Sequence, residues 1–139
     1  MAGTVIADKL EAASTSTLVL KNGVASTPPT VQDSAGTQIG TFCRAWVNFN
    51  GTSTVAIRAS FNVTSITDNG TGDYTVNFTT SMPDANYSLA TNSPNTSGNN
   101  PLITGKDNGT AFTTTACRVG VNQQTTRVDS ADVTVAIFR

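Results

Sequence analysis

The chain contains 139 residues, a length typical of one domain, and carries a formal net charge of −1. Only 12% of its residues are charged and none is histidine, which argues against a nucleic-acid interface, a His-ligated zinc site and a Ser-His or Cys-His catalytic pair. Threonine, asparagine and serine supply 25, 13 and 12 residues, and so many β-branched and turn-forming side chains predict an all-β fold.

Residues 1–37 are predicted to form an extended N-terminal arm with one or two short strands. The neighbouring prolines Pro28 and Pro29 lack the backbone donors that the interior of a sheet requires. An arm with so few apolar side chains cannot bury itself, so we expect it to lie on another chain. The side chains expected at that interface are Val5, Ile6, Leu10, Leu18 and Leu20.

Residues 38–139 are predicted to form one β domain. From residue 41 to residue 49 the chain alternates, with residues 43, 45, 47 and 49 on one face. Residues 60–67 are predicted to be one strand that carries Phe61 and Val63 on the same face, with a bulge near Thr64. Residues 68–72 have the composition of a hairpin loop, after which residues 74, 76 and 78 face inward.

Strands and turns continue to alternate in the second half of this domain. Residues 85, 87 and 89 are predicted to share an inward face, and residues 91–100 to form an exposed polar loop. Two last strands are expected over residues 112–121 and 131–138. Six to eight short strands indicate an antiparallel β-sandwich, with a small barrel as the next choice.

The acidic and sulfur-containing residues suggest little chemistry. Asp68, Asn69 and Asp73 could supply three calcium ligands, but capping of their own turn is the favoured interpretation. Cys43 and Cys117 could form a disulfide only if the fold brings them together, and two free thiols are expected. We therefore expect no catalytic residues, no metal and no cofactor.

Trp46 and Arg44 are the candidate interface residues of the β domain. Both are predicted to lie on the face opposite Val47. The single tryptophan could stack on a sugar ring, but packing in a core or at an interface is the commoner role for such a residue. The sequence contains no apolar stretch that could span a membrane and no secretory signal, so we expect synthesis in a cytoplasm.

Two segments of this domain resemble a module of tailed-bacteriophage virion proteins, above all those of phages that infect marine and freshwater bacteria such as cyanobacteria. The segments are RAWVNFNGT at residues 44–52 and IRASFNVTSITDNGTGDYTVNF at residues 57–78. The resemblance extends over residues 43–90 and more loosely over the C-terminal strands. It implies a phage structural protein and carries over no catalytic residue.

Tail fibres that contain this module are usually longer and have a shaft. An arm joined to one β domain is therefore more similar to a head decoration or cement protein, which would bridge neighbouring capsid subunits on the capsid surface. The resemblance implies two partners, the major capsid protein and further copies of this chain, with a homotrimer as the expected oligomer. The alternative is a tail-associated knob or short fibre whose loop at residues 92–100 contacts the host receptor.

Overall fold

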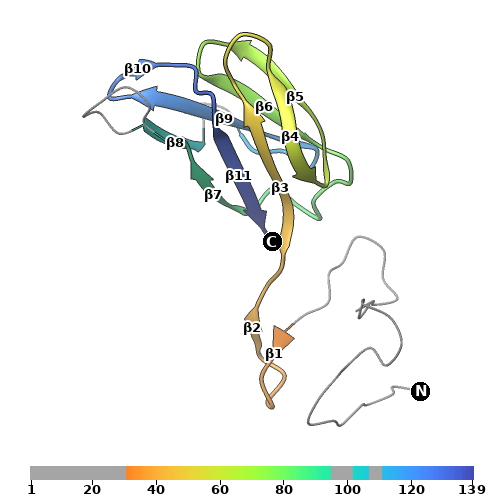
Figure 1. Cartoon of the computed structure of the whole chain (residues 1–139). Helices are drawn as coiled ribbons and strands as arrows, with labels where there is room; N and C mark the ends of the chain where they lie inside the picture. The colour runs from red at the N-terminus through yellow and green to blue at the C-terminus, as the bar shows by residue number, and fades with distance from the viewer. Residues whose placement is uncertain (1–30, 95–101, 107–110) are drawn as a thin grey trace, which may run out of the picture.

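The computed structural model describes residues 31–94, 102–106 and 111–139, and most of these residues form an antiparallel β-sandwich (Figure 1). One layer, the β3 sheet, contains in spatial order β4 (Ala56–Phe61), β3 (Cys43–Asn50), β11 (Val133–Phe138) and β7 (Ser88–Asn92). The other layer, the β6 sheet, contains β5 (Val63–Gly70), β6 (Asp73–Phe78), β9 (Ala116–Gln123) and β8 (Leu102–Lys106), with β10 (Thr126–Arg127) also paired to β9. The predicted all-β sandwich is confirmed, and the sheets do not close into a barrel.

The core lies between the two sheets and is built from four central strands. Alternate residues of each strand point inward, and their side chains are almost completely buried. Phe49 from β3 packs edge-on against Tyr74 from β6, with the ring centroids 5.2 Å apart. The inward faces comprise Ala45, Val47 and Phe49 of β3, Tyr74, Val76 and Phe78 of β6, Cys117, Val119 and Val121 of β9, and Val133, Val135 and Ile137 of β11.

The predicted hairpin is formed by β5 and β6, and its irregularities lie where the sequence indicates them. The register shifts between Val63 and Ser65, which confirms the predicted bulge. In the loop Gly72 has a φ of +62°, and a Cβ added there would lie 2.5 Å from the carbonyl oxygen of Val121. Only glycine accommodates both this backbone conformation and this close approach.

The prediction of a single strand over residues 60–67 is wrong. Asn62 has a φ of +55° and separates β4, which ends at Phe61, from β5, which begins at Val63 in the opposite sheet. Phe61 is consequently 55% exposed, whereas Val63 is buried. Asparagine adopts this left-handed conformation more readily than most residues, so one residue suffices to change sheets.

Two further expectations need adjustment. The strand predicted to begin at residue 112 begins at Ala116, because the Thr113 hydroxyl accepts a hydrogen bond from the Ala116 amide and makes a turn. Phe112 instead stacks on Tyr87, with the ring centroids 4.7 Å apart. Of the loop predicted at residues 91–100, residues 91 and 92 belong to β7, and residues 95–100 lie outside the described residues.

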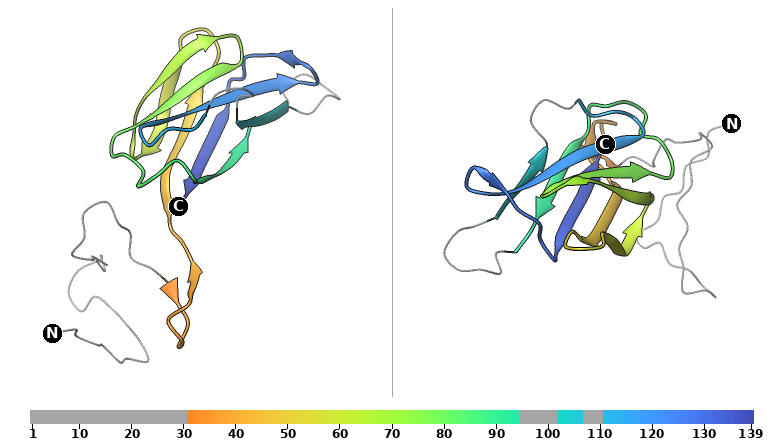
Figure 2. Two further views of the ribbon diagram at one scale, coloured as in Figure 1. Left: turned by 180° about the vertical axis from the view of Figure 1, so that it is seen from behind. Right: turned by 90° about the horizontal axis from the view of Figure 1, so that it is seen from above.

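A separate two-stranded hairpin precedes the sandwich. It consists of β1 (Val31–Gln32) and β2 (Gln38–Gly40), which pair with each other, and the first sandwich strand starts only at Cys43. The hairpin projects away from the sandwich at the end where the C-terminus lies (Figures 1 and 2). We call residues 31–42 the hairpin arm. The boundary drawn at residue 37 in the sequence thus falls inside this hairpin, between its turn and β2.

None of the described residues belongs to a helix that could cross a membrane.

Candidate functional site

The outer face of the β3 sheet carries a row of apolar side chains that crosses all four strands. Strand pairing places Trp46 between Phe61 and Ala136, and Ala136 beside Ala90. Trp46 is 40% exposed and Phe61 is 55% exposed. We call Phe61, Trp46, Ala136 and Ala90 the apolar row. Contiguous exposed apolar surface is a feature of many interaction sites, so we treat this row as a candidate binding surface.

The outer face of the β6 sheet has a different character. The Asn77 amide donates hydrogen bonds to the hydroxyls of Ser65 at 3.1 Å and Thr67 at 2.9 Å, and the Asn69 amide donates to the Thr75 hydroxyl at 2.9 Å. Short polar side chains therefore cover this face and bind one another. Of the two outer faces, that of the β3 sheet is better suited to bury surface against a partner.

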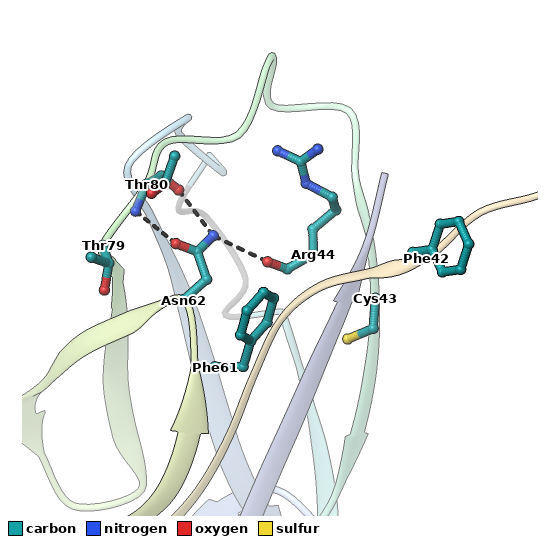
Figure 3. A pocket seen from close by; sticks show the side chains of 7 residues that line it. All are labelled: Phe42, Cys43, Arg44, Phe61, Asn62, Thr79 and Thr80. Atoms are coloured by element: carbon teal, nitrogen blue, oxygen red, sulfur yellow. Dashed lines mark hydrogen bonds between the residues drawn. The ribbon is translucent and has the colours of Figure 1, made fainter. Parts of the chain in front are cut away.

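A hollow of about 530 Å³ lies at one end of the apolar row (Figure 3). We call it the Phe61 hollow. It is lined by residues 42–44 from the start of β3, by Phe61 and Asn62, and by residues 79–80. Two of these side chains, Phe42 and Phe61, are exposed aromatic rings. Among the described residues that line it, only Arg44 is charged, so this part of the hollow combines apolar walls with a positive charge.

Asn62 holds the wall of this hollow in place. Its side-chain amide donates hydrogen bonds to the carbonyl oxygens of Arg44 and Thr80, each at 3.1 Å (Figure 3). Its side-chain oxygen accepts a hydrogen bond of 2.7 Å from the Thr80 amide. One side chain thus connects β3, the β4–β5 crossing and the segment that follows β6. These hydrogen bonds fix the shape of the wall within the chain itself.

A second hollow, of about 440 Å³, lies over the middle of the same face. We call it the Trp46 hollow. Trp46, Ala90 and Ala136 form its apolar part, and Asn48 and Asn92 add side-chain amides. An aromatic ring next to amide groups is a combination that can bind either a protein surface or a sugar.

Both candidate interface residues of the β domain lie on this face. Trp46 is in the apolar row and does not belong to the core, and half-buried Arg44 lines the Phe61 hollow. The candidates Val5, Ile6, Leu10, Leu18 and Leu20 lie outside the described residues. Sequence reasoning missed Phe61 and the alanines of the apolar row. Phe61 could have been found only by recognising the left-handed Asn62 beside it.

The carboxylates have structural partners. Asp73 is buried and forms two hydrogen bonds with Arg118, one of them 2.7 Å long, and Arg127 lies 3.7 Å away. The hydrogen bonds from Arg118 hold the pKa of Asp73 below its usual value, although burial opposes the shift. The Asp68 side chain accepts a hydrogen bond of 2.9 Å from the Gly70 amide, as expected for a turn cap.

Two exposed carboxylates pair with arginines that are distant in sequence. Asp132 lies 2.7 Å from Arg58, and Asp84 accepts two hydrogen bonds from Arg139. Within residues 31–94, 102–106 and 111–139 no cluster of three or more acidic or cysteine side chains could hold a metal ion.

The two cysteines are free thiols and do not form a disulfide. Cys117 is buried in the core, and burial raises the pKa of its thiol to about 12. Cys43 is half-buried and lines the Phe61 hollow. Cys117 is therefore chemically inert in the folded protein, whereas Cys43 can report on whether the hollow is covered.

Comparison of the chain with protein-family models, with curated proteins and with solved structures found no match.

Proposed function

We propose that this protein is a tailed-bacteriophage virion protein that decorates and cements the capsid surface. The observation that carries the proposal is the apolar row on the open face of the β3 sheet, with Trp46 and Phe61 exposed side by side. Exposed aromatic side chains that line concave surfaces, as Trp46 and Phe61 do, are typical anchors of a protein interface. The resemblance of residues 44–52 and 57–78 to phage virion modules gives this interface its biological setting.

In this role the apolar row and its two hollows bind a neighbouring protein in the capsid shell. Each copy then contacts more than one subunit, the major capsid protein and further copies of this chain. Many weak contacts repeated by the symmetry of the shell give a high total affinity. The resulting lattice of bridges opposes the outward pressure of packaged DNA. We propose a homotrimer as the unit that binds, as in the sequence-based expectation.

An add-back experiment tests this proposal. Full-length protein is titrated onto capsids of a phage strain that lacks its gene, and the bound amount is measured relative to the major capsid protein. We expect binding to saturate at a fixed ratio of this chain to the major capsid protein. The decorated capsids should release their DNA at a higher temperature than the same capsids without the protein. Trp46→Ser should weaken binding strongly, whereas the control Ile57→Ser, at another exposed apolar residue of the β3 sheet, should not. Failure of the wild-type protein to bind capsids would contradict the proposal.

A tail-associated receptor-binding protein is the second candidate. The observation in its favour is the Trp46 hollow, where an indole ring lies beside the amides of Asn48 and Asn92. Under this alternative Trp46→Ala, or replacement of residues 92–100, reduces adsorption of the phage to host cells. Normal adsorption of both variants, together with loss of capsid binding by Trp46→Ala, would favour the capsid protein.

A further inference from the structure

The hairpin arm exposes apolar side chains that none of the other described residues covers. Every residue from 31 to 39 is exposed, and the exposed fractions are 42% for Val31 and 64% for Ile39. Phe42, at the base of the arm, is 42% exposed. Exposed β-branched and aromatic residues on a short isolated hairpin are unfavourable in a free monomer, because such a hairpin is at best marginally stable.

The turn of this hairpin is nevertheless well organised. The Asp33 carboxylate accepts hydrogen bonds from the amides of Ala35 and Thr37, each at 2.9 Å. The Asp33 amide donates a hydrogen bond of 2.9 Å to the Thr37 carbonyl, and Gly36 supplies a left-handed φ of +82°. A hairpin with a preformed turn loses little conformational entropy when it docks.

The Phe61 hollow is complementary to the hairpin arm in shape and in charge. It is a concave apolar surface beside the base of the arm, and Phe42 belongs to both. Asp33 is the only charged residue of the arm, and Arg44 is the only charged residue among the described residues that line the hollow. The arm therefore matches the hollow in apolar character and is opposite to it in charge.

The arm does not occupy the hollow of its own chain. Its turn lies at the end of the hairpin that is farthest from the sandwich, and the hairpin continues away from the start of β3 (Figures 1 and 2). We propose that the hairpin arm of one copy packs into the Phe61 hollow of a second copy. This inference deepens the proposed assembly role and rests on it: the partner at this hollow is another copy of the same chain.

Such a contact is head-to-tail, because it joins two different surfaces: the arm of one copy packs into the hollow of the next, and each copy contributes one arm and one hollow. Repetition of a directional contact closes into a ring when the rotation between neighbours allows it. In that ring every arm and every hollow is used, and both surfaces that a monomer would expose are covered. A closed ring is also consistent with the proposed homotrimer.

The first test measures the mass of the purified full-length chain in solution by light scattering and native mass spectrometry. The wild type should be an oligomer. Ile39→Ser in the arm and Phe61→Ser in the hollow should each weaken association by about tenfold to a hundredfold, as expected for loss of one buried apolar side chain. Ile57→Ser, at an exposed residue outside the hollow on the same strand as Phe61, should leave association unchanged. A monomeric wild type would overturn the inference.

Mixing the two variants distinguishes exchange between copies from a general effect on folding. The Ile39→Ser chain keeps an intact hollow, and the Phe61→Ser chain keeps an intact arm. At a concentration where each variant alone is monomeric, an equimolar mixture should form a complex of two chains, one of each kind. A mixture that stays monomeric, although circular dichroism shows both chains folded, would overturn the inference.

Thiol labelling provides an independent readout. Cys43 lines the Phe61 hollow, so a docked arm should shield it from a maleimide reagent. Labelling should be slow in the wild type and several-fold faster in Ile39→Ser, while the buried Cys117 stays unlabelled in both. Equal labelling rates would contradict docking at this hollow. These solution experiments contain no capsid, so their failure would leave the capsid-binding proposal to be judged by the add-back experiment.

Discussion

The hydroxyl of Tyr74 donates toward the carboxylate of Asp129, 2.9 Å away, and also lies 2.7 Å from the carbonyl oxygen of Gly51. Tyr74 belongs to β6, whereas Gly51 follows β3 in the other sheet. Asp129 also accepts a hydrogen bond of 2.7 Å from the Gly72 amide in the β5–β6 loop. One buried phenol therefore connects the two sheets at the end of the sandwich where the β5–β6 loop lies, opposite the hairpin arm.

Tyr74→Phe should destabilise the protein without altering its outer faces. The ring still packs against Phe49, but the hydrogen bonds of the hydroxyl to the Gly51 carbonyl and the Asp129 carboxylate are lost. We expect the free energy of unfolding to fall by about 1–2 kcal/mol, measured by urea denaturation. Ser81→Ala, at an exposed residue, should change it by less than about 0.5 kcal/mol. Equal stabilities of Tyr74→Phe and the wild type would show that this connection contributes nothing.

The two tyrosines should make the fold sensitive to alkaline pH. Burial raises the pKa of both Tyr74 and Tyr87 well above the ordinary value of 10, and the Asp129 carboxylate adds to the shift at Tyr74. The folded state therefore holds these protons more tightly than the unfolded state. The contribution of the two protonated phenols to the free energy of unfolding is fully present below pH 10 and is lost as the pH rises beyond that value.

A spectrophotometric titration checks this expectation. These are the only tyrosines of the chain, so the absorbance of phenolate reports on them alone. In the folded protein it should appear well above pH 10, together with unfolding, whereas in urea it should appear near 10. Ionisation near pH 10 in the folded protein would contradict the buried placement of both rings.

Asp73 should contribute stability that depends on acid pH. The pKa of its carboxyl is lowered, chiefly by hydrogen bonds from Arg118, so its contribution is present above the ordinary value of 3.8 and is lost as the pH falls through the lower folded value. Asp73→Asn should reduce the free energy of unfolding at pH 7 by about 1–3 kcal/mol. The difference in free energy of unfolding between variant and wild type, measured by urea denaturation, should decrease toward pH 2. A difference that does not change with pH would contradict the ion-pair role.

Asn62 offers a test of the strand crossing that shapes the Phe61 hollow. Asn62→Ala loses three hydrogen bonds and puts at a φ of +55° a residue that disfavours this conformation more than asparagine does. Asn62→Gly loses the same bonds but tolerates that φ. We expect thermal denaturation to show a loss of stability for both, larger for alanine by about 1 kcal/mol. If alanine were tolerated as well as glycine, the left-handed crossing would be ruled out.

The core strands were predictable because alternation is a strong signal when one face is buried. β3, β6 and β11 carry their buried apolar residues at every second position, and the loop between β5 and β6 is rich in Asp, Asn and Gly. The bulge near Thr64 was visible for the same reason, since Ile66 is out of phase with Val63.

The site was harder to predict, because it depends on which strands become neighbours. Trp46 and Arg44 were placed on the correct face by alternation alone. The apolar row, however, arises from pairing β3 with β4 and β11, and its members lie up to 90 residues apart in the chain. The hollow depends further on the left-handed φ of Asn62, a conformation that the residue type permits but does not require.

Decoration of the capsid is tested most directly by the number of copies of this chain in a purified virion, counted by quantitative mass spectrometry against the major capsid protein. A capsid decoration protein should be present at hundreds of copies, on the order of the number of capsid subunits, and in a fixed ratio to them. A handful of copies would contradict decoration of the shell and assign the chain to the tail. Its absence from the virion would contradict the whole account.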